Sequence, residues 1–243
     1  MIMSSFLNAF LDVILPPLCH VCRSYISDAG ALHICQSCRS QIQLVTTPLC
    51  TTCGVPFNGA GSDHICGACL TDRPCFDSAR AAVIHEGHCR HLIHAFKYNN
   101  KTHLRRALAL LITEHLTEFV ALLKPDMIVP VPLHIQRLRK RGFNQAILLG
   151  EILARAWRVP MERRALKRVR KTEPQITLSA KERRDNVRNA FEVGHVGAVS
   201  GKRIVLVDDV LTTGCTADEC ARVLKKAGAL EVTVITAARA INI

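Results

Sequence analysis

The stretch RIVLVDDVLTTGCTADE, residues 203–219, decides the fold. It begins with the apolar run 204–207, which is typical of a central strand buried on both faces of a parallel sheet. Two acidic residues follow, and then a short turn rich in threonine and glycine leads into a helix expected at 216–227. Because open α/β sheets bind ligands outside the carboxyl ends of their strands, we expect a ligand site at this turn.

The residue types after the strand indicate the chemistry of that ligand. A glycine and several hydroxyl residues at a helix N-terminus offer N–H and O–H donors to a phosphate. Two neighbouring carboxylates would repel a phosphate, but they can accept hydrogen bonds from the vicinal hydroxyls of a ribose. An acidic turn that only caps the helix would explain one aspartate and not the whole string. The sequence therefore predicts a ribose 5-phosphate site made of Asp208, Asp209, Thr212, Thr213, Gly214, Cys215 and Thr216.

Short apolar segments alternate with helical ones from about residue 77 onward. This order predicts an α/β fold with a mostly parallel sheet and helices on both faces. Gly228 directly follows the last helix, at the usual position of a left-handed C-cap. We divide the chain into a cysteine-rich domain at 1–75 and an α/β domain at 76–243. Strands are expected at 81–85, 127–132, 203–210 and 232–238, and helices near 89–97, 103–123, 143–157 and 216–227.

The cysteine-rich domain contains four C-x-x-C pairs, separated by 12, 11 and 12 residues. Two thiolates at this spacing can face one ion, and two such pairs complete a tetrahedral zinc site. Disulfides are the weaker alternative in a reducing compartment. Because cysteine fills every ligand position, each of the two expected zinc ions has a structural role.

The spacing leaves two ways to pair the C-x-x-C motifs. Interleaved pairing, first with third and second with fourth, has the same spacing as sequential pairing and stays open. We favour sequential pairing, which makes two zinc ribbons in tandem. Its ligands are Cys19, Cys22, Cys35 and Cys38 for one ion, and Cys50, Cys53, Cys66 and Cys69 for the other.

The first 15 residues are apolar but do not resemble a signal peptide, because no Lys or Arg occurs before Arg23 and Asn8 and Asp12 interrupt the run. Their apolar residues have helical spacing, so we expect a short amphipathic helix that ends at the prolines 16–17. No apolar run in the chain reaches the roughly 18 residues that a membrane helix needs. We therefore expect a cytoplasmic protein without membrane insertion.

Four histidines, His85, His88, His91 and His94, recur at every third position. They could line one face of a helix and hold a metal. A basic helix surface with incidental imidazoles is the favoured interpretation, because Cys89 is the only other ligand type at a suitable spacing.

The positive charge is concentrated in one block. The whole chain has a formal net charge of +12, whereas residues 1–75 hold three basic and four acidic residues. Residues 134–190 hold sixteen basic residues and five acidic ones, a balance of +11. A block of one sign attracts polyanions, although a solvated basic face is the simpler alternative. Because this block adjoins the predicted phosphate site, we favour a polyanion partner.

The chain resembles the ComF family, and its 203–219 stretch resembles the phosphoribosyl pyrophosphate (PRPP) motif of type I phosphoribosyltransferases. The resemblance covers almost the full length and includes segments in the order typical of the family. These are the four C-x-x-C pairs, FKYNNK at 96–101, VPVPLH at 129–134, RLRKRGFNQ at 137–145, QITLSAKERRDNVRNAF at 175–191 and the PRPP motif.

The resemblance implies roles for individual residues. The acid pair would contact the ribose hydroxyls of PRPP, and the Thr/Gly loop would hold its 5-phosphate. Mg²⁺ is expected with PRPP, coordinated mostly by ligand oxygens and water. The turn after Val131-Pro132 would bind pyrophosphate, and the segment 171–188 corresponds to a mobile catalytic loop. The implied pyrophosphate or polyanion contacts are Lys97, Arg137, Arg141, Asn144, Gln145, Lys171, Arg183 and Arg188.

The family resemblance implies a role in natural transformation, in which the protein handles incoming single-stranded DNA beside a DNA-uptake helicase. The basic region 134–190 would attract the DNA backbone. Aromatic residues near it are few (Tyr98, Phe96, Phe143 and Trp157), so we expect binding to be mainly electrostatic. The alternative is a phosphoribosyltransferase acting on an unidentified acceptor, although no general base stands out. A third hypothesis is a regulator in which PRPP alters partner binding.

Overall fold

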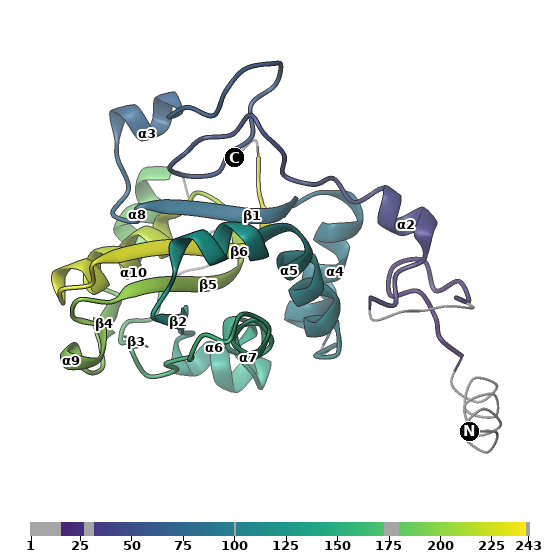
Figure 1. The fold of residues 1–243 in the computed structure, drawn as a ribbon. Helices are drawn as coiled ribbons and strands as arrows, with labels where there is room; N and C mark the ends of the chain where they lie inside the picture. Colours follow the sequence, from purple (N-terminus) through teal and green to yellow (C-terminus); the bar gives the residue numbers. More distant parts are fainter. Residues whose placement is uncertain (1–15, 27–31, 100, 173–179, 242–243) are drawn as a thin grey trace.

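The computed structural model describes residues 16–26, 32–99, 101–172 and 180–241, except the side chains of 180, 181 and 183. The expected N-terminal helix therefore lies outside the described residues. The centre of the fold is a parallel sheet, as expected (Figure 1). Its four strands are, in spatial order, β1 (Ser78–Ile84), β6 (Glu231–Arg239), β5 (Arg203–Leu211) and β2 (Met127–Pro130).

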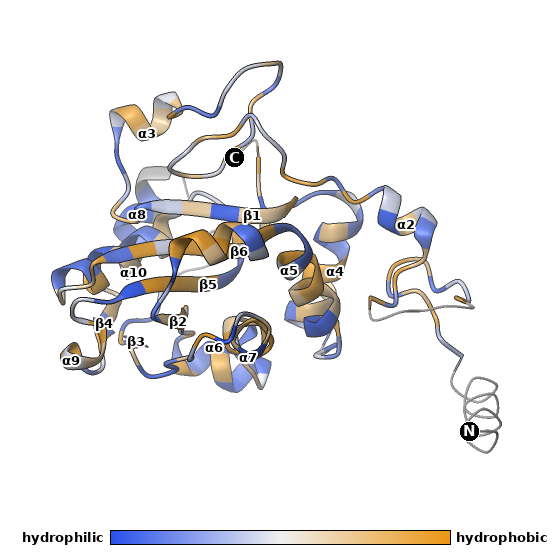
Figure 2. Ribbon diagram, viewed as in Figure 1, coloured by the Kyte–Doolittle hydropathy of each residue, from blue (hydrophilic) through white to orange (hydrophobic). Residues whose placement is uncertain are grey.

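Helices cover both faces of this sheet, which explains why its central strands are continuously apolar. Val205 and Val207 of β5 belong to one buried cluster, while Ile204 and Leu206 belong to another. Figure 2 shows the resulting hydrophobic central strands. The first cluster includes residues of α4 (Gly87–Tyr98), α5 (Leu104–Leu123) and α7 (Gln145–Trp157), and the second includes residues of α10 (Cys215–Lys226).

The helix expected at 143–157 is confirmed as α7. A separate short helix that was not predicted, α6 (Ile135–Arg141), precedes it. Gly142 ends α6 in the left-handed conformation, with φ +81°. Asn144 then begins α7, because its side-chain oxygen accepts a hydrogen bond from the N–H of Ala146 at 2.9 Å.

The segment between α7 and β5 forms a small layer that the sequence did not predict. An antiparallel pair, β3 (Leu166–Arg168) with β4 (Phe191–Val193), flanks α8 (Ala180–Val187), and the short α9 (Val196–Val199) precedes β5. Leu166 and Phe191 are buried in the cluster that α10 covers. Each strand has only three residues, which is too short for a readable alternation of polar and apolar residues.

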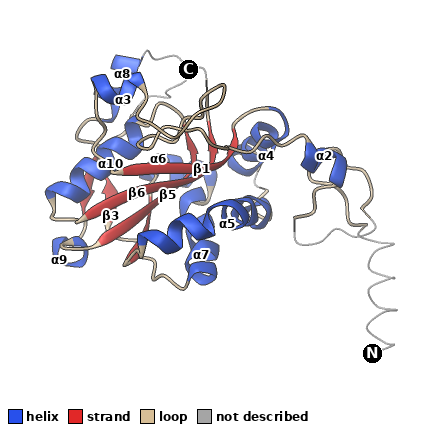
Figure 3. Ribbon diagram, turned by 45° about the horizontal axis from the view of Figure 1, so that its top comes forward, coloured by secondary structure: helices blue, strands red, loops and turns tan. Residues whose placement is uncertain are grey.

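The cysteine-rich segment meets the α/β part at two separate places (Figures 1 and 3). Near α2 (Gln36–Ser40), Arg39 forms an ion pair with Glu114 of α5 at 3.0 Å. Beyond it the chain reaches β1, where Gly54 lies so close to the carbonyl oxygen of Ala79 that a Cβ would be 2.4 Å from it. The short helix α3 (Gly67–Thr71) follows on that side.

Among the residues that the structure describes, no helix combines the length and apolarity needed to cross a membrane.

Candidate functional site

The sheet splits at the carboxyl end of β2, and the acid pair lies at this split. Strand β2 pairs with β5 only as far as Pro130 opposite Val207. Strand β5 continues beside β6 to Leu211, so its last residues lack a partner on the β2 side. The helix after β5 covers one face of the sheet and α7 after β2 covers the other. Open α/β sheets form their ligand crevice at such a point, where the helices that follow two neighbouring strands cover opposite faces of the sheet.

Asp209 is almost fully buried, at 5% exposure, and is held by a cation from α4. Its Oδ1 atom is 2.9 Å from the Nζ atom of Lys97. Burial alone would lower the pKa of the Lys97 ammonium, but the charges of Asp209 and Asp208 outweigh burial and raise that pKa above its usual value. Lys97 and Asp209 therefore form a largely buried carboxylate–ammonium ion pair at the site.

The half-buried Asp208 has a carboxyl group that is protonated more easily than an ordinary aspartate. Its Oδ1 atom accepts a hydrogen bond from the backbone N–H of Asp209 at 2.8 Å. Burial, followed by the adjacent charge of Asp209, raises the pKa of the Asp208 carboxyl to about 7. Asp208 can thus change its protonation state near neutral pH.

The loop after the acid pair, residues 212–216, leads directly into the N-terminus of α10. Gly214 is the N-cap of α10 and adopts the left-handed conformation, with φ +83°. The Thr213 hydroxyl donates to the Sγ atom of Cys215 at 3.2 Å. Thr212, Thr213 and Gly214 remain partly exposed, so their polar groups are accessible in front of the helix. An N–H-rich helix start of this kind favours an anion.

Arg168 of β3 lies near Asp208, and Arg137 of α6 lies beside Arg168. The Nη2 atom of Arg137 donates to the carbonyl oxygen of Thr172 at 3.0 Å, and Arg168 contacts the Thr172 hydroxyl. Burial, together with the neighbouring charge of Arg137, lowers the pKa of Arg168 to about 10, while the charge of Asp208 opposes this decrease. The sequence analysis named Arg137 but not Arg168, because β3 had not been predicted.

Arg239 is a second residue that the sequence analysis missed. It ends β6, and the parallel register places it opposite Leu211 of β5. Its guanidinium donates to the carbonyl oxygens of Leu211, at 2.9 Å, and of Thr212. Arg239 therefore holds the backbone at the start of the loop 212–216. A sequence signal was available, because Arg239 directly follows the apolar segment expected as the last strand, and that strand was expected in the same sheet as 203–210.

The other predicted polyanion contacts are spread over several surroundings. Arg141 lies 5.1 Å above the ring of Tyr98. Asn144 and Gln145 are buried, and the Asn144 amide nitrogen donates to the carbonyl oxygen of Val131 at 3.0 Å. Lys171 and Arg188 are exposed, and the Arg183 side chain lies outside the described residues. The structure brings Lys97 to Asp209 and Arg137 to the neighbourhood of Arg168, and the binding roles of all these residues stay predictions.

The eight paired cysteines form two clusters in the sequential grouping. Cys19, Cys22, Cys35 and Cys38 make one cluster, and Cys50, Cys53, Cys66 and Cys69 make the other, with all sulfurs of a cluster within 4.8 Å of one another. Among the described residues no other metal-ligand group of this kind occurs, so the histidines of α4 form none.

The geometry of both clusters fits zinc. The Sγ atoms of Cys22 and Cys35 are 3.7 Å apart, as are those of Cys53 and Cys66. Four sulfurs about 2.3 Å from a zinc ion would be roughly 3.8 Å from one another in a tetrahedron. The backbone N–H of Cys66 also points at the Sγ atom of Cys50, at 3.3 Å, as expected for thiolate ligands. In each cluster the four cysteines would hold one ion and leave no position for substrate.

Comparison with known proteins identifies the family. The double zinc ribbon domain matches residues 10–70, and the phosphoribosyl transferase domain matches residues 146–241. The chain is 41% identical over 157 residues to Competence protein F of Haemophilus influenzae, covering 61% of this chain and 67% of that protein. The chain belongs to the ComF family.

Other relatives agree with this assignment. DNA utilization protein YhgH of Escherichia coli K12 is 40% identical over 146 residues, which cover 59% of this chain and 63% of that protein. Competence protein ComFC of Bacillus subtilis is 35% identical over 117 residues, covering 48% of this ComF chain and 45% of the relative. The match thus spans about two thirds of the H. influenzae and E. coli proteins and less than half of the B. subtilis one.

Two solved structures are also similar to this ComF chain. One is the glutamine PRPP amidotransferase from B. subtilis, at 24% identity and a TM-score of 0.37, covering 58% of this chain and 30% of that chain. The other is an adenine phosphoribosyltransferase, at 19% identity and a TM-score of 0.39, covering 60% of this chain and 74% of that chain.

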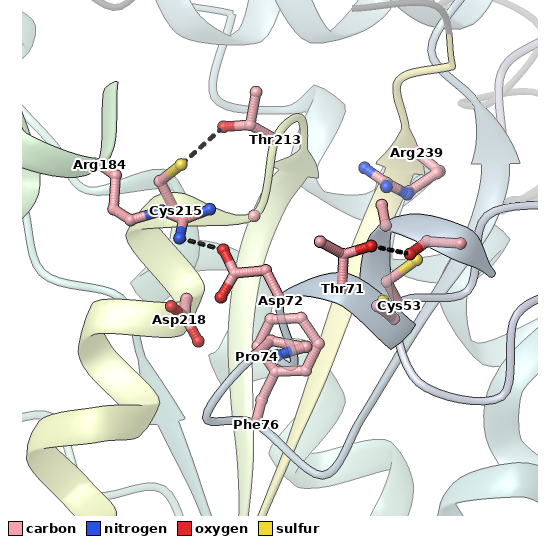
Figure 4. Close-up of a pocket in the computed structure, with 14 residues that line it drawn as sticks. Cys53, Thr71, Asp72, Pro74, Phe76, Arg184, Thr213, Cys215, Asp218 and Arg239 are labelled. Carbon is pink, nitrogen blue, oxygen red and sulfur yellow. Dashed lines mark hydrogen bonds and ion pairs between the residues drawn. The ribbon is translucent and has the colours of Figure 1, made fainter. Parts of the chain in front are cut away.

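In this ComF family member, a cleft of about 480 Å³ lies between the second cysteine cluster and the loop 212–216 (Figure 4). The buried ring of Phe76 and residues of α3 form one side, and the loop forms another. Two ion-pairing side chains, Arg184 and Asp72, meet at its rim. The second zinc ribbon is therefore directly adjacent to the loop that follows the acid pair.

Proposed function

We propose that this ComF protein binds Mg²⁺-PRPP at the acid pair and phosphate loop, and that it handles single-stranded DNA during natural transformation. The observation that carries the proposal is the placement of Asp208 and Asp209 at the split of the sheet, directly before a helix N-terminus capped by Gly214. The names of the relatives, competence protein and DNA utilization protein, supply the biological setting.

PRPP has three parts, and each has a counterpart at the site. The 5-phosphate would accept hydrogen bonds from the N–H and hydroxyl groups of the loop 212–216. The ribose hydroxyls would donate to the acid pair, as hydroxyls do to carboxylates. The pyrophosphate would lie toward Arg137 and Arg168, whose planar guanidinium groups suit phosphate oxygens. Mg²⁺ would contribute by neutralising pyrophosphate oxygens, with water completing its coordination.

A calorimetric titration with PRPP in the presence of Mg²⁺ tests the first half of the proposal. Wild-type protein should bind, and Asp208→Asn should bind at least about 10-fold more weakly, because one charge-assisted hydrogen bond contributes about 1.5–3 kcal/mol. Glu118→Gln is the matched control, since Glu118 is exposed on α5, far along the chain from the acid pair. Equal binding by wild type and Asp208→Asn would contradict the placement of the ribose.

The basic region supports the second half of the proposal. Within 134–190, Arg139 and Lys140 of α6 and Lys171 are exposed, so their charges are available to a polyanion. Each contact with a phosphate releases counterions, and log K for a single strand should fall with log salt by about 0.7 per contact. Fluorescence anisotropy of a labelled oligonucleotide at several salt concentrations measures this slope. An affinity that does not depend on salt would contradict electrostatic DNA binding.

The second candidate function is a phosphoribosyl transfer to an acceptor held in the cleft beside the loop. The cleft is large enough for a small molecule and combines the apolar Phe76 wall with the carboxylate of Asp218 and the guanidinium of Arg239. Its test is Mg²⁺-dependent release of pyrophosphate from PRPP in the presence of nucleobases and amines. Release that exceeds spontaneous hydrolysis and disappears in Asp209→Asn would favour the enzyme over the binding protein.

A further inference from the structure

Tyr98 is the one aromatic residue near the basic region that the described structure leaves exposed. Phe96 is fully buried, and Phe143 packs beside it with ring centroids 5.7 Å apart. Trp157 is partly buried, and its Nε1 atom donates to the Thr117 hydroxyl at 3.0 Å. In contrast, Tyr98 is 61% exposed at the end of α4. Among these four aromatic residues, Tyr98 therefore offers the most accessible ring for stacking with a nucleic-acid base.

The ring of Tyr98 is already held in a defined orientation by its neighbours. The guanidinium of Arg141, at the end of α6, lies 5.1 Å from the centroid of the ring. His94, one turn earlier on α4, lies with its ring centroid 4.8 Å from that of Tyr98, at an angle of 43° between the planes. Cation–π contact and ring packing lower the entropy that the side chain would lose when a further planar group stacks on it.

The charge around this ring is positive on both contributing helices. Arg139 and Lys140 are exposed on α6 beside Arg141. On α4, Arg90 is exposed, whereas the charge of Lys97 is already paired with Asp209. A phosphate backbone that follows α6 would thus bring its bases within reach of a flat ring, which is the combination that binds unpaired nucleotides with little sequence preference.

We propose that Tyr98, Arg141 and His94 form a stacking platform for one unpaired base of a single-stranded nucleic acid. The inference rests on the DNA-handling half of the proposed function and assigns it a place on the molecule. In a duplex the faces of the bases are covered by their neighbours in the stack, so the platform selects single strands. Lys140 would contribute to binding only through its charge on the phosphates, whereas Tyr98 would contribute only through the stacking of its uncharged ring on a base.

A mutant cycle between protein and oligonucleotide tests the platform. The ligands are a labelled single-stranded oligonucleotide and the same strand with abasic residues throughout, which keeps the phosphates but removes the bases. Tyr98→Leu should weaken binding of the normal strand about 5- to 150-fold, the range for stacking one base. It should leave binding of the abasic strand, and the salt slope of both strands, unchanged.

Three further variants serve as controls. Tyr98→Phe keeps the ring face and should bind both strands like wild type. Tyr25→Leu removes the other exposed tyrosine, which is 60% exposed in the cysteine-rich segment, and should have no effect. Lys140→Gln should weaken both strands alike and reduce the salt slope by about 0.7, as expected for one lost phosphate contact.

The outcomes separate the platform from DNA binding as such. Equal effects of Tyr98→Leu on the normal and abasic strands would overturn the platform while leaving electrostatic DNA binding intact. A weaker effect of Tyr98→Leu than of Tyr25→Leu would also overturn it. Failure of the wild-type protein to bind either strand at low salt would overturn both the platform and the DNA-handling proposal.

Discussion

The buried ion pair between Lys97 and Asp209 gives a quantitative test of how the acid pair is held. Its Nζ and Oδ1 atoms are 2.9 Å apart, and both side chains are largely shielded from water. Asp208 lies beside the pair and shares its charge environment. Replacement of Lys97 by Met removes the cation and leaves two adjacent carboxylates at the split of the sheet.

The cost of this change can be worked out from the distance. At an effective dielectric constant of about 20, two unit charges 2.9 Å apart attract by roughly 6 kcal/mol. Mutants that remove one partner of a buried pair lose about 3–5 kcal/mol of stability, because the remaining charge stays buried. We therefore expect Lys97→Met to lower the free energy of unfolding by about 3–5 kcal/mol at pH 8. For a chain of this size, that corresponds to a decrease in Tm on the order of 10 °C.

Adding Asp209→Asn to Lys97→Met should restore part of the lost free energy of unfolding. In the double variant Lys97→Met with Asp209→Asn, no uncompensated charge remains at Asp209, so its free energy of unfolding should exceed that of Lys97→Met alone. The loss in Lys97→Met should also be smaller at pH 5.5 than at pH 8, because protonation of Asp208 relieves the repulsion between the carboxylates. Urea denaturation of the zinc-loaded proteins, followed by circular dichroism, measures the free energy of unfolding of the wild type, the two single variants Lys97→Met and Asp209→Asn, and the double variant.

The exposed pair Arg39–Glu114 is the matched control, with 53% and 34% of its side chains exposed. Arg39→Met should cost less than about 1 kcal/mol, as surface pairs do. If the losses in Lys97→Met and Asp209→Asn simply add in the double variant, the two groups do not interact as described. A loss in Lys97→Met no larger than that in Arg39→Met would refute the reasoning in the same way.

Four further changes should have distinct effects. Cys50→Ser should reduce bound zinc from two ions to one and unfold the second ribbon, which metal analysis and limited proteolysis would show. Gly54→Ala places a Cβ 2.4 Å from the Ala79 oxygen, so it should loosen the contact with β1 and cost more than about 1 kcal/mol by urea denaturation. In Gly214→Ala the new Cβ makes only ordinary van der Waals contacts, the nearest with Phe76 at 3.8 Å, but the backbone is strained at φ +83°. The variant should therefore weaken Mg²⁺-PRPP binding measured by calorimetry, at a stability cost of only about 1–2 kcal/mol. The pKa of Asp208 is about 7 in the folded chain and about 4 when unfolded, so stability should fall as pH rises from about 4 to 7, and Asp208→Asn should remove that part of the dependence.

The β5 stretch was predictable from the sequence because its fold and its chemistry are both local. A continuous apolar run, two acids and a Thr/Gly turn occupy adjacent positions, so strand, site and helix follow from one another. The spacing of the C-x-x-C pairs likewise predicted two four-cysteine sites, and the structure shows the sequential grouping rather than the interleaved one. In both cases the interacting residues are near in sequence or repeat at a fixed interval.

The contacts that complete the site depend on packing between distant segments. Lys97 reaches Asp209 because α4 packs beside the carboxyl edge of the sheet, and no local pattern encodes that contact. Arg168 required the short β3, and Arg239 required the register of β6 against β5. Arg168 and Arg239 could be named only once the strands had been paired, whereas Lys97 was named from the family resemblance but without its partner Asp209.

Hydrogen–deuterium exchange of the segment 208–219, with and without Mg²⁺-PRPP, tests the central claim most directly. Mg²⁺-PRPP should slow amide exchange in this segment, because the N–H groups of the loop and of the first turn of α10 would bind the 5-phosphate. Asp208→Asn should show this protection only at higher PRPP concentration. Unchanged exchange in 208–219 at saturating PRPP, or protection confined to the second ribbon, would contradict the site described here.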